Sequence, residues 1–269
     1  QKLVEVMHYN MDTRPRLIFA DLWTIVAGHL TGTALHSNPA IAMYAVDSFR
    51  QLSIQYLQRD ELEVFEFQRR FLKPLETIMA KSEQVSTKEL LLNCVDRIMQ
   101  VFRSDSKDLD DTEAGLKPKG GLRSGWVPIL TILGFGGRDR DEGISRMSFK
   151  ILKDEINECL DDVGKAGVLL AEHFIETVSA LLMFVSGLHK EVSLLAIDQL
   201  VSLARFLVDD SFAPPQLRRR TMPSATSFHS NDADVKQELE LWWPILLGLS
   251  KAVGDPRVDV RSKGLHTLV

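Results

Sequence analysis

The chain has 269 residues, 45% of them hydrophobic and 26% charged, so it can bury a sizeable core as one large domain, two ordinary domains or an elongated array. Its formal net charge of −5 argues against general nucleic-acid binding, which requires a basic surface. Its two cysteines, Cys94 and Cys159, lie far apart within helical patterns, and we expect them to be buried free thiols in a reducing compartment.

The two ends of the sequence indicate a segment of a longer protein. Gln1 is not a natural start, and Val269 falls inside an apolar helical pattern. The longest uncharged apolar run, VSALLMFVSGL at residues 178–188, is too short to span a bilayer. We therefore expect a soluble, intracellular fragment.

Apolar residues recur at i, i+3, i+4 and i+7 along nearly every long segment, which predicts an all-α fold. The segment MYAVDSFRQLSIQYL, residues 43–57, begins a frame in which a small residue is followed at once by an apolar one. The frame occurs five times, with the small residue at Ala45, Cys94, Ser148, Ala196 and Gly264. Apolar residues stand four positions before and four positions after each small residue, namely Ile41 and Phe49, Leu90 and Ile98, Ile144 and Leu152, Val192 and Leu200, and Val260 and Leu268.

Three prolines support the same frame. Pro74, Pro128 and Pro244 each lie 20 residues before the small residue of their own unit. A proline costs little at the start of a helix, where its missing N–H would have no partner anyway. Each unit is thus predicted to contain a helix A that is opened or kinked by proline, a turn, and a helix B that carries the small residue.

The spacing of the frame predicts a helical-repeat array. The units recur 49, 54, 48 and 68 residues apart, slightly longer than the roughly 40–47 residues of HEAT and armadillo repeats. We predict an armadillo/HEAT-like α-solenoid of about five helix pairs. Repeats would cover residues 1–210, with a mobile insertion at about 103–121; a flexible linker would cover 211–235, and residues 236–269 would start the next repeat.

No arrangement of residues predicts catalysis, a metal site or a cofactor. The histidines and cysteines lack a ligand spacing such as HExxH, and Glu172, His173 and Glu176 resemble an ordinary solvated helix start. The string GFGGRDRDEG, residues 134–143, lacks both a following GK[ST] and the glutamate of a calcium loop. We predict a turn between helices A and B there, and no enzyme in this chain.

Some features favour binding instead. Asp47 and Arg50 lie three residues apart on one helix face, where we expect a surface or inter-repeat ion pair. In LEVFEFQRRFLKPLE, residues 62–76, three phenylalanines surround three cations, which suits a protein interface or an anionic membrane. Core phenylalanines beside solvated cations are the simpler interpretation. LRRRTMPS, residues 217–224, suggests a kinase site or lipid contact, or merely a solvated charge run.

The string AVDSFRQLSIQYLQRDELEVFEFQRRFLKPLETIM, residues 45–79, closely resembles a block in the large Golgi Arf guanine nucleotide exchange factors, the brefeldin A-inhibited exchange proteins and their fungal and plant counterparts. The matching residues are Asp47 to Ser53, Phe67, Gln68, Phe71, Leu72 and Pro74. The likeness extends to YNM at 9–11, the region of Trp23, RSGW at 123–126 and, more loosely, the closing WWPILLGLS and DVRSKGL.

This resemblance implies the helical homology region downstream of the catalytic exchange domain, and thus a non-catalytic, regulatory role. The implied partners are GTP-bound Arf, other domains of the same exchange factor and the anionic Golgi membrane, and no nucleic acid. The implied location is cytoplasmic, peripheral at the Golgi and trans-Golgi network, where the region would control recruitment and autoinhibition. The candidate partner-binding residues are Asp47, Arg50, Gln51, Phe67, Gln68, Arg69 and Arg70.

The alternative function is that of a general helical-repeat scaffold or cargo adaptor of the karyopherin-like kind, which binds peptides along a concave face. It depends on the repeat pattern alone.

Overall fold

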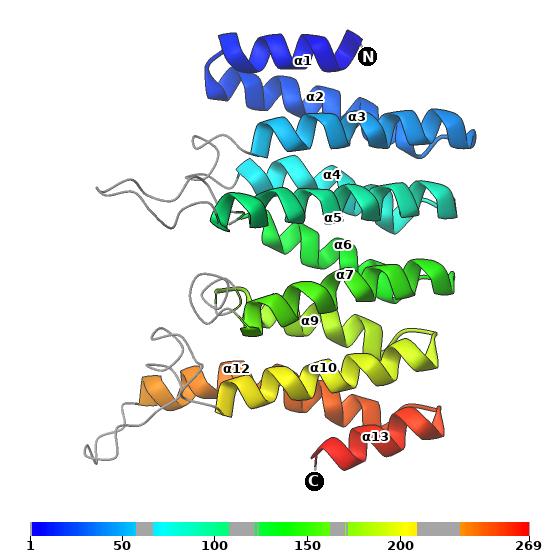
Figure 1. Ribbon diagram of the computed structural model, residues 1–269, viewed down its shortest axis with the longest axis vertical. Coiled ribbons are helices and arrows are strands. Elements are labelled where there is room, and N and C mark those ends of the chain that lie inside the picture. The colour runs from blue at the N-terminus through cyan, green and yellow to red at the C-terminus, as the bar shows by residue number, and fades with distance from the viewer. Residues whose placement is uncertain are drawn as a thin grey trace. The chain divides into compact units, whose positions relative to one another are not determined.

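A computed structural model of the chain describes residues 2–57, 67–107, 122, 124–161, 170, 172–208 and 232–268, with only the backbone of residues 12, 16, 17, 54, 55, 67, 102–107 and 232–240. Every regular element in these ranges is an α-helix, so the predicted all-α fold is confirmed. The helices, labelled as in Figure 1, are α1 (Lys2–Thr13), α2 (Arg16–Ala34), α3 (Pro39–Leu57), α4 (Phe67–Lys81), α5 (Val85–Lys107), α6 (Trp126–Gly137), α7 (Glu142–Asp161), α9 (Phe174–Val185), α10 (Lys190–Val208), α12 (Asp232–Val253) and α13 (Val258–Leu268).

The chain folds as two compact units, Gln1–Ile132 and Leu133–Val269, and the division falls within α6. Of the predicted insertion, residues 103–107 continue α5 and residues 108–121 lie outside the described residues. The predicted linker lies outside them as far as residue 231, and α12 already begins at Asp232. The string at 217–224 falls in the same undescribed range, so its predicted role stays a prediction.

The first unit consists of two layers of helices. In Figure 1, α2 and α4 lie side by side in one layer, and α3 and α5 lie side by side in the other. Each helix of one layer is followed in the sequence by its partner in the other, which gives the pairs α2–α3 and α4–α5, and α1 packs on the first pair. This arrangement is the helix A and helix B alternation that the sequence predicts.

The small residues of the frame explain how closely the B helices approach. Ala45 on α3 and Cys94 on α5 are buried, and the apolar residues that follow them, Val46 and Val95, are fully buried. A short side chain at the contact lets two helix backbones come together without leaving a void. The repeated residues of the frame are therefore buried on both helices of this layer.

The second unit repeats this plan. Helices α7, α10 and α13 form one layer, and α9 and α12 pack on each other and on α10. Ser148, Ala196 and Gly264 are buried, and a Cβ added at Gly264 would lie 3.0 Å from the Cβ of Ala252. Both units are consistent with armadillo/HEAT-like repeats, and the number of five pairs stays a prediction.

Three positions of the frame are exposed rather than buried. Leu265 and Leu268 lie on α13, where no further described helix covers that side, and Ile41 lies in the first turn of α3.

Ion pairs that the frame did not predict connect successive B helices of the second unit: Arg146–Glu191, Lys190–Asp259 and Lys263–Asp198.

The three frame prolines take two kinds of position. Pro128 is the third residue of α6, as expected for a helix start, whereas Pro74 and Pro244 lie inside α4 and α12. An interior proline removes one helical hydrogen bond, because it has no N–H to donate to the carbonyl four residues earlier.

The predicted turn between two helices is confirmed, but it is shorter than the string at 134–143: α6 continues to Gly137 and α7 begins at Glu142. Asp139 Oδ1 accepts the N–H of Asp141 at 2.9 Å, and Asp141 Oδ1 accepts the N–H of Ile144 at 3.0 Å. The two carboxylates thus form the turn and begin the helix.

Candidate partner-binding site

Asp47, Arg50 and Gln51 form one hydrogen-bonded cluster on α3. The Arg50 guanidinium donates to Asp47 Oδ1 through Nε at 2.8 Å and lies 2.7 Å from it through Nη2, and Gln51 Nε2 donates to Asp47 Oδ2 at 2.7 Å. The side chains of Arg50 and Asp47 are 39% and 36% exposed, so the predicted ion pair is confirmed as a surface pair. Such a pair contributes only about 0.2–0.5 kcal/mol to stability, but it fixes the directions of all three side chains.

An exposed aromatic residue continues this face of α3. Tyr44 lies one turn before Asp47 and is 78% exposed, whereas Val46, Phe49 and Leu52 on the opposite side are fully buried. Tyrosine and arginine are enriched at the centres of protein interfaces, because they combine large contact area with directional hydrogen bonds. Tyr44, Asp47, Arg50 and Gln51 are called the α3 cluster below.

The candidates at the start of α4 divide into exposed and buried residues. Arg69 and Arg70 are exposed, but Gln68 is only 1% exposed. Gln68 Oε1 accepts the backbone N–H of Gly125 at 3.2 Å, which connects α4 to the chain entering α6. The amide therefore has a structural partner inside the first unit. The side chain of Phe67 lies outside the described part of the chain.

The seven predicted residues do not come together as one site. Asp47, Arg50 and Gln51 lie in the layer of α3 and α5, whereas Arg69 and Arg70 lie on α4 in the other layer. The two groups are close in the sequence because α4 follows α3. Successive helices belong to different layers, so the two groups lie in different layers of the repeat.

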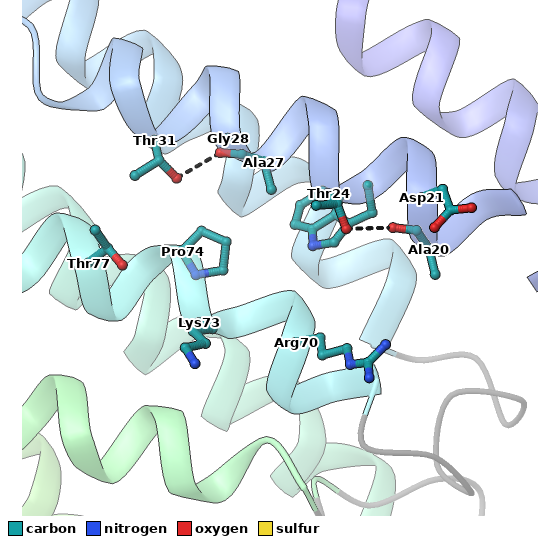
Figure 2. Close-up of a pocket in the computed structure, with 11 residues that line it drawn as sticks. Ala20, Asp21, Thr24, Ala27, Gly28, Thr31, Arg70, Lys73, Pro74 and Thr77 are labelled. Carbon is teal, nitrogen blue, oxygen red and sulfur yellow. Dashed lines mark hydrogen bonds between the residues drawn. The ribbon is translucent and has the colours of Figure 1, made fainter. Parts of the chain in front are cut away.

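A groove that the sequence analysis missed lies between α2 and α4 (Figure 2). It has a volume of about 510 Å³, and the two helices run in the same direction along it. Its α2 wall consists of Ala20, Asp21, Trp23, Thr24, Ala27, Gly28 and Thr31, and its α4 wall of Arg70, Lys73, Pro74 and Thr77. We call it the α2–α4 groove.

The charged groups of this groove are a pair of cations and one carboxylate. Arg70 and Lys73 are exposed, and neither takes part in an ion pair among the described residues. Asp21 lies on the opposite helix, and Figure 2 shows it at the same end of the groove as Arg70. Outside the groove on α4, burial raises the pKa of the Glu76 carboxyl, and the nearby Lys73 and Arg69 lower it by less.

One signal in the sequence marks the groove. Small side chains stand at Ala20, Thr24, Ala27, Gly28 and Thr31, close to a helical spacing on one side of α2. The α4 wall gives no such signal, because nothing local indicates which helix packs beside α2.

No group of three His, Cys, Asp or Glu side chains among the described residues is arranged to hold a metal ion. Cys94 and Cys159 are buried free cysteines, as predicted, and burial raises the pKa of the Cys94 thiol to about 12. Such a thiol stays protonated and unreactive. Among the described helices, none combines the length and the apolar character needed to cross a bilayer.

Comparison with known proteins identifies relatives of the whole chain. Residues 55–107 match a family model described as Sec7-like HDS, from Mon2/Sec7/BIG1-like proteins. The chain is 30% identical to brefeldin A-inhibited guanine nucleotide-exchange protein 3 and 29% identical to exchange protein 1 of Arabidopsis thaliana, each over 99% of its length. It is 28% identical to exchange protein 1 of Homo sapiens over 100% of its length.

The chain spans only 13–15% of the length of these relatives. The matched region is the HDS region, which is separate from the catalytic Sec7 domain. The resemblance that the sequence indicated is therefore confirmed, and so is the prediction that this segment is non-catalytic. The family model covers Arg69 and Arg70 but begins at residue 55, after the α3 cluster.

Proposed function

We propose that this chain is a regulatory segment of a large Arf guanine nucleotide exchange factor, and that it binds GTP-loaded Arf to control recruitment and autoinhibition at the Golgi and trans-Golgi network. Neighbouring domains of the same exchange factor and the anionic membrane surface are further partners. The observation that carries the proposal is the similarity to exchange proteins over the entire chain, with the family match in the HDS region.

The α3 cluster is the surface that we assign to Arf. A small GTPase presents different switch surfaces with GDP and with GTP, so a protein that contacts the switches distinguishes the two states by differential affinity. Asp47 holds Arg50 and Gln51 in place before any partner arrives, so little side-chain entropy is lost on binding. Tyr44 beside them supplies exposed apolar area.

A weak contact is sufficient for this role. A dissociation constant of about 1 μM corresponds to about −8 kcal/mol. When both partners are attached to one membrane, the effective concentration rises and such a contact becomes largely occupied. The product of exchange would then recruit more exchange factor, which is positive feedback.

Liposome flotation tests the proposal. The purified chain is mixed with vesicles that carry lipid-anchored Arf loaded with GDP or with a GTP analogue, and the floated fraction is measured. We expect recovery with the GTP form only, and loss of recovery in the double variant Tyr44→Ala, Arg50→Glu. Arg205→Glu, a matched charge reversal at an exposed position of α10, should float like the unaltered chain.

Two outcomes would contradict the proposal in different ways. Equal recovery with both nucleotide states would exclude a sensor of GTP-loaded Arf. Nucleotide-dependent recovery that persists in the folded double variant would keep the function and remove the α3 cluster as its site.

A further inference from the structure

The α2–α4 groove has dimensions that suit a short peptide. Its volume of about 510 Å³ lies within the range of about 300–1,000 Å³ that is usual for ligand pockets. Its lining runs along α2 from Ala20 to Thr31, which at 1.5 Å per residue is about 16 Å. About five residues of an extended peptide cover that length.

The groove is open because α2 presents short side chains to it. A Cβ added at Gly28 would meet no atom within 4 Å, so the space beside this residue is not filled by α4. Figure 2 shows Thr31 and Thr77 facing each other at one end, and Lys73 and Pro74 on the middle of the α4 wall. The space is therefore bounded by two helices along its full length.

Trp23 and Pro74, which both line the groove, each affect its hydrogen bonding. Trp23 is 3% exposed, and its indole N–H has no acceptor among the described residues. Pro74 has no N–H, so the backbone carbonyl of Arg70 lacks the helical donor that residue 74 would otherwise supply. The Trp23 nitrogen is itself buried, so a ligand in the groove does not reach it unless the side chain shifts.

The charges of the groove select an acidic ligand. Arg70 and Lys73 outnumber Asp21, whereas the chain as a whole has a net charge of −5. This local excess of positive charge attracts carboxylates. A membrane surface fits less well, because the lining is recessed and its carboxylate would face the lipid phosphates. A peptide can avoid that repulsion by placing a hydroxyl or amide opposite Asp21.

From these features we propose that the α2–α4 groove binds an acidic peptide segment of a partner protein. Carboxylates of the peptide pair with Arg70 and Lys73. The inference goes beyond the proposed function, because the groove lies in the layer of α2 and α4, whereas the α3 cluster lies in the layer of α3 and α5.

Fluorescence anisotropy with the 269-residue chain tests this inference. The probe is a short fluorescein-labelled peptide in which Asp and Glu alternate with Ala and Ser, and the control peptide has Asn and Gln in place of the acids. We expect the acidic peptide to bind at least about tenfold more tightly than the control, with an affinity that falls as salt is added.

Substitutions at two glycines of α2 separate the groove from the rest of the helix. Gly28→Leu places a side chain in the open space of the groove and should weaken peptide binding at least about tenfold without unfolding the chain. Gly32→Leu is the matched control, since Gly32 also faces open space but does not line the groove. Thermal unfolding of both variants checks that they are folded.

Charge reversals test the two cations. Arg70→Glu combined with Lys73→Glu should abolish binding of the acidic peptide, whereas Lys81→Glu at the exposed end of α4 should leave it unchanged. None of these variants should alter flotation with GTP-loaded Arf, so the groove and the proposed function are tested separately.

Three results would overturn the inference. The first is equal affinity for the acidic and neutral peptides. The second is unchanged binding in Gly28→Leu. The third is the absence of peptide binding together with retention on phosphatidylserine vesicles that the double reversal removes, which would identify a lipid site instead.

Discussion

The indole of Trp23 stacks on the phenyl ring of Phe71, with ring centroids 3.9 Å apart and an angle of 16° between the planes. This contact joins α2 to α4, and Tyr56 of α3 lies within 5.4 Å of the Phe71 ring centroid. One pair of rings thus joins two successive repeats of the first unit and supports the floor of the α2–α4 groove.

Phe71→Ala should destabilise the first unit by about 3–5 kcal/mol, because Phe71 is fully buried and its removal leaves a cavity against Trp23. Urea unfolding followed by tryptophan fluorescence measures the change. Tyr44→Ala, an aromatic truncation at a largely exposed site, should stay within about 0.5 kcal/mol. Equal effects of the two substitutions would show that the aromatic stack does not hold the helices together.

Arg257→Ala should destabilise the second unit by about 1.5–3 kcal/mol. The guanidinium donates to Val185 O at 3.1 Å, to Ser193 Oγ at 3.1 Å and to Asp255 Oδ2 at 2.8 Å, so it connects the turn before α13 to α9 and α10. Chemical unfolding gives the value, and Arg205→Ala, at an exposed position of α10, is the control. If both variants unfold at the same denaturant concentration, the network is not stabilising.

The stability of the second unit should depend on the ionisation of Asp255. The hydrogen bond from Arg257 holds the pKa of the Asp255 carboxyl below its ordinary value of 3.8. Because the folded state favours the charged carboxylate, this stabilisation is present at pH values above the ordinary pKa. It is lost as the pH falls through the lower pKa that Asp255 has in the folded chain. In Asp255→Asn, the free energy of unfolding of the second unit should depend less on pH in the acid range. An unchanged dependence would show that ionisation of Asp255 does not stabilise this unit.

Cys94 should resist thiol reagents in the folded chain, since the burial that raises its pKa to about 12 leaves almost no thiolate at neutral pH. With Cys159→Ala present, the rate of reaction with a chromogenic disulfide measures Cys94 alone. We expect the rate to follow the opening of the first unit as urea is added. If Cys94 reacts at once and completely without denaturant, its thiol is not buried in the folded chain.

Gly187→Ala should destabilise the second unit by at least about 1–3 kcal/mol. A Cβ at this position would lie 2.2 Å from the carbonyl oxygen of Gly137, which is backbone and cannot rotate away. Gly254→Ala is a suitable comparison, because its Cβ would meet an ordinary contact at 3.4 Å. Differential scanning calorimetry should therefore show a lower Tm for the first variant only.

The parts of the fold that depend on one helix at a time were predictable from the sequence. The positions of Ala45, Cys94 and Ala196 follow from helical periodicity, and all three are buried. The ion pair between Asp47 and Arg50 also follows, because both residues lie within one turn of α3.

The parts that depend on two distant segments were not predictable. Gln68 is identified as a candidate contact residue by resemblance alone, yet its amide is buried against Gly125, 57 residues later. The α2–α4 groove requires the knowledge that α4 packs beside α2. In both cases the deciding contact joins residues that no local pattern relates.

The bond between Gln68 and Gly125 also has a consequence for the stability of the first unit. It connects the first turn of α4, where Arg69 and Arg70 are exposed, to Gly125, which directly precedes α6. A substitution of Gln68 that removes this acceptor would leave the buried N–H of Gly125, at the entrance to α6, without the partner that it has in the folded chain.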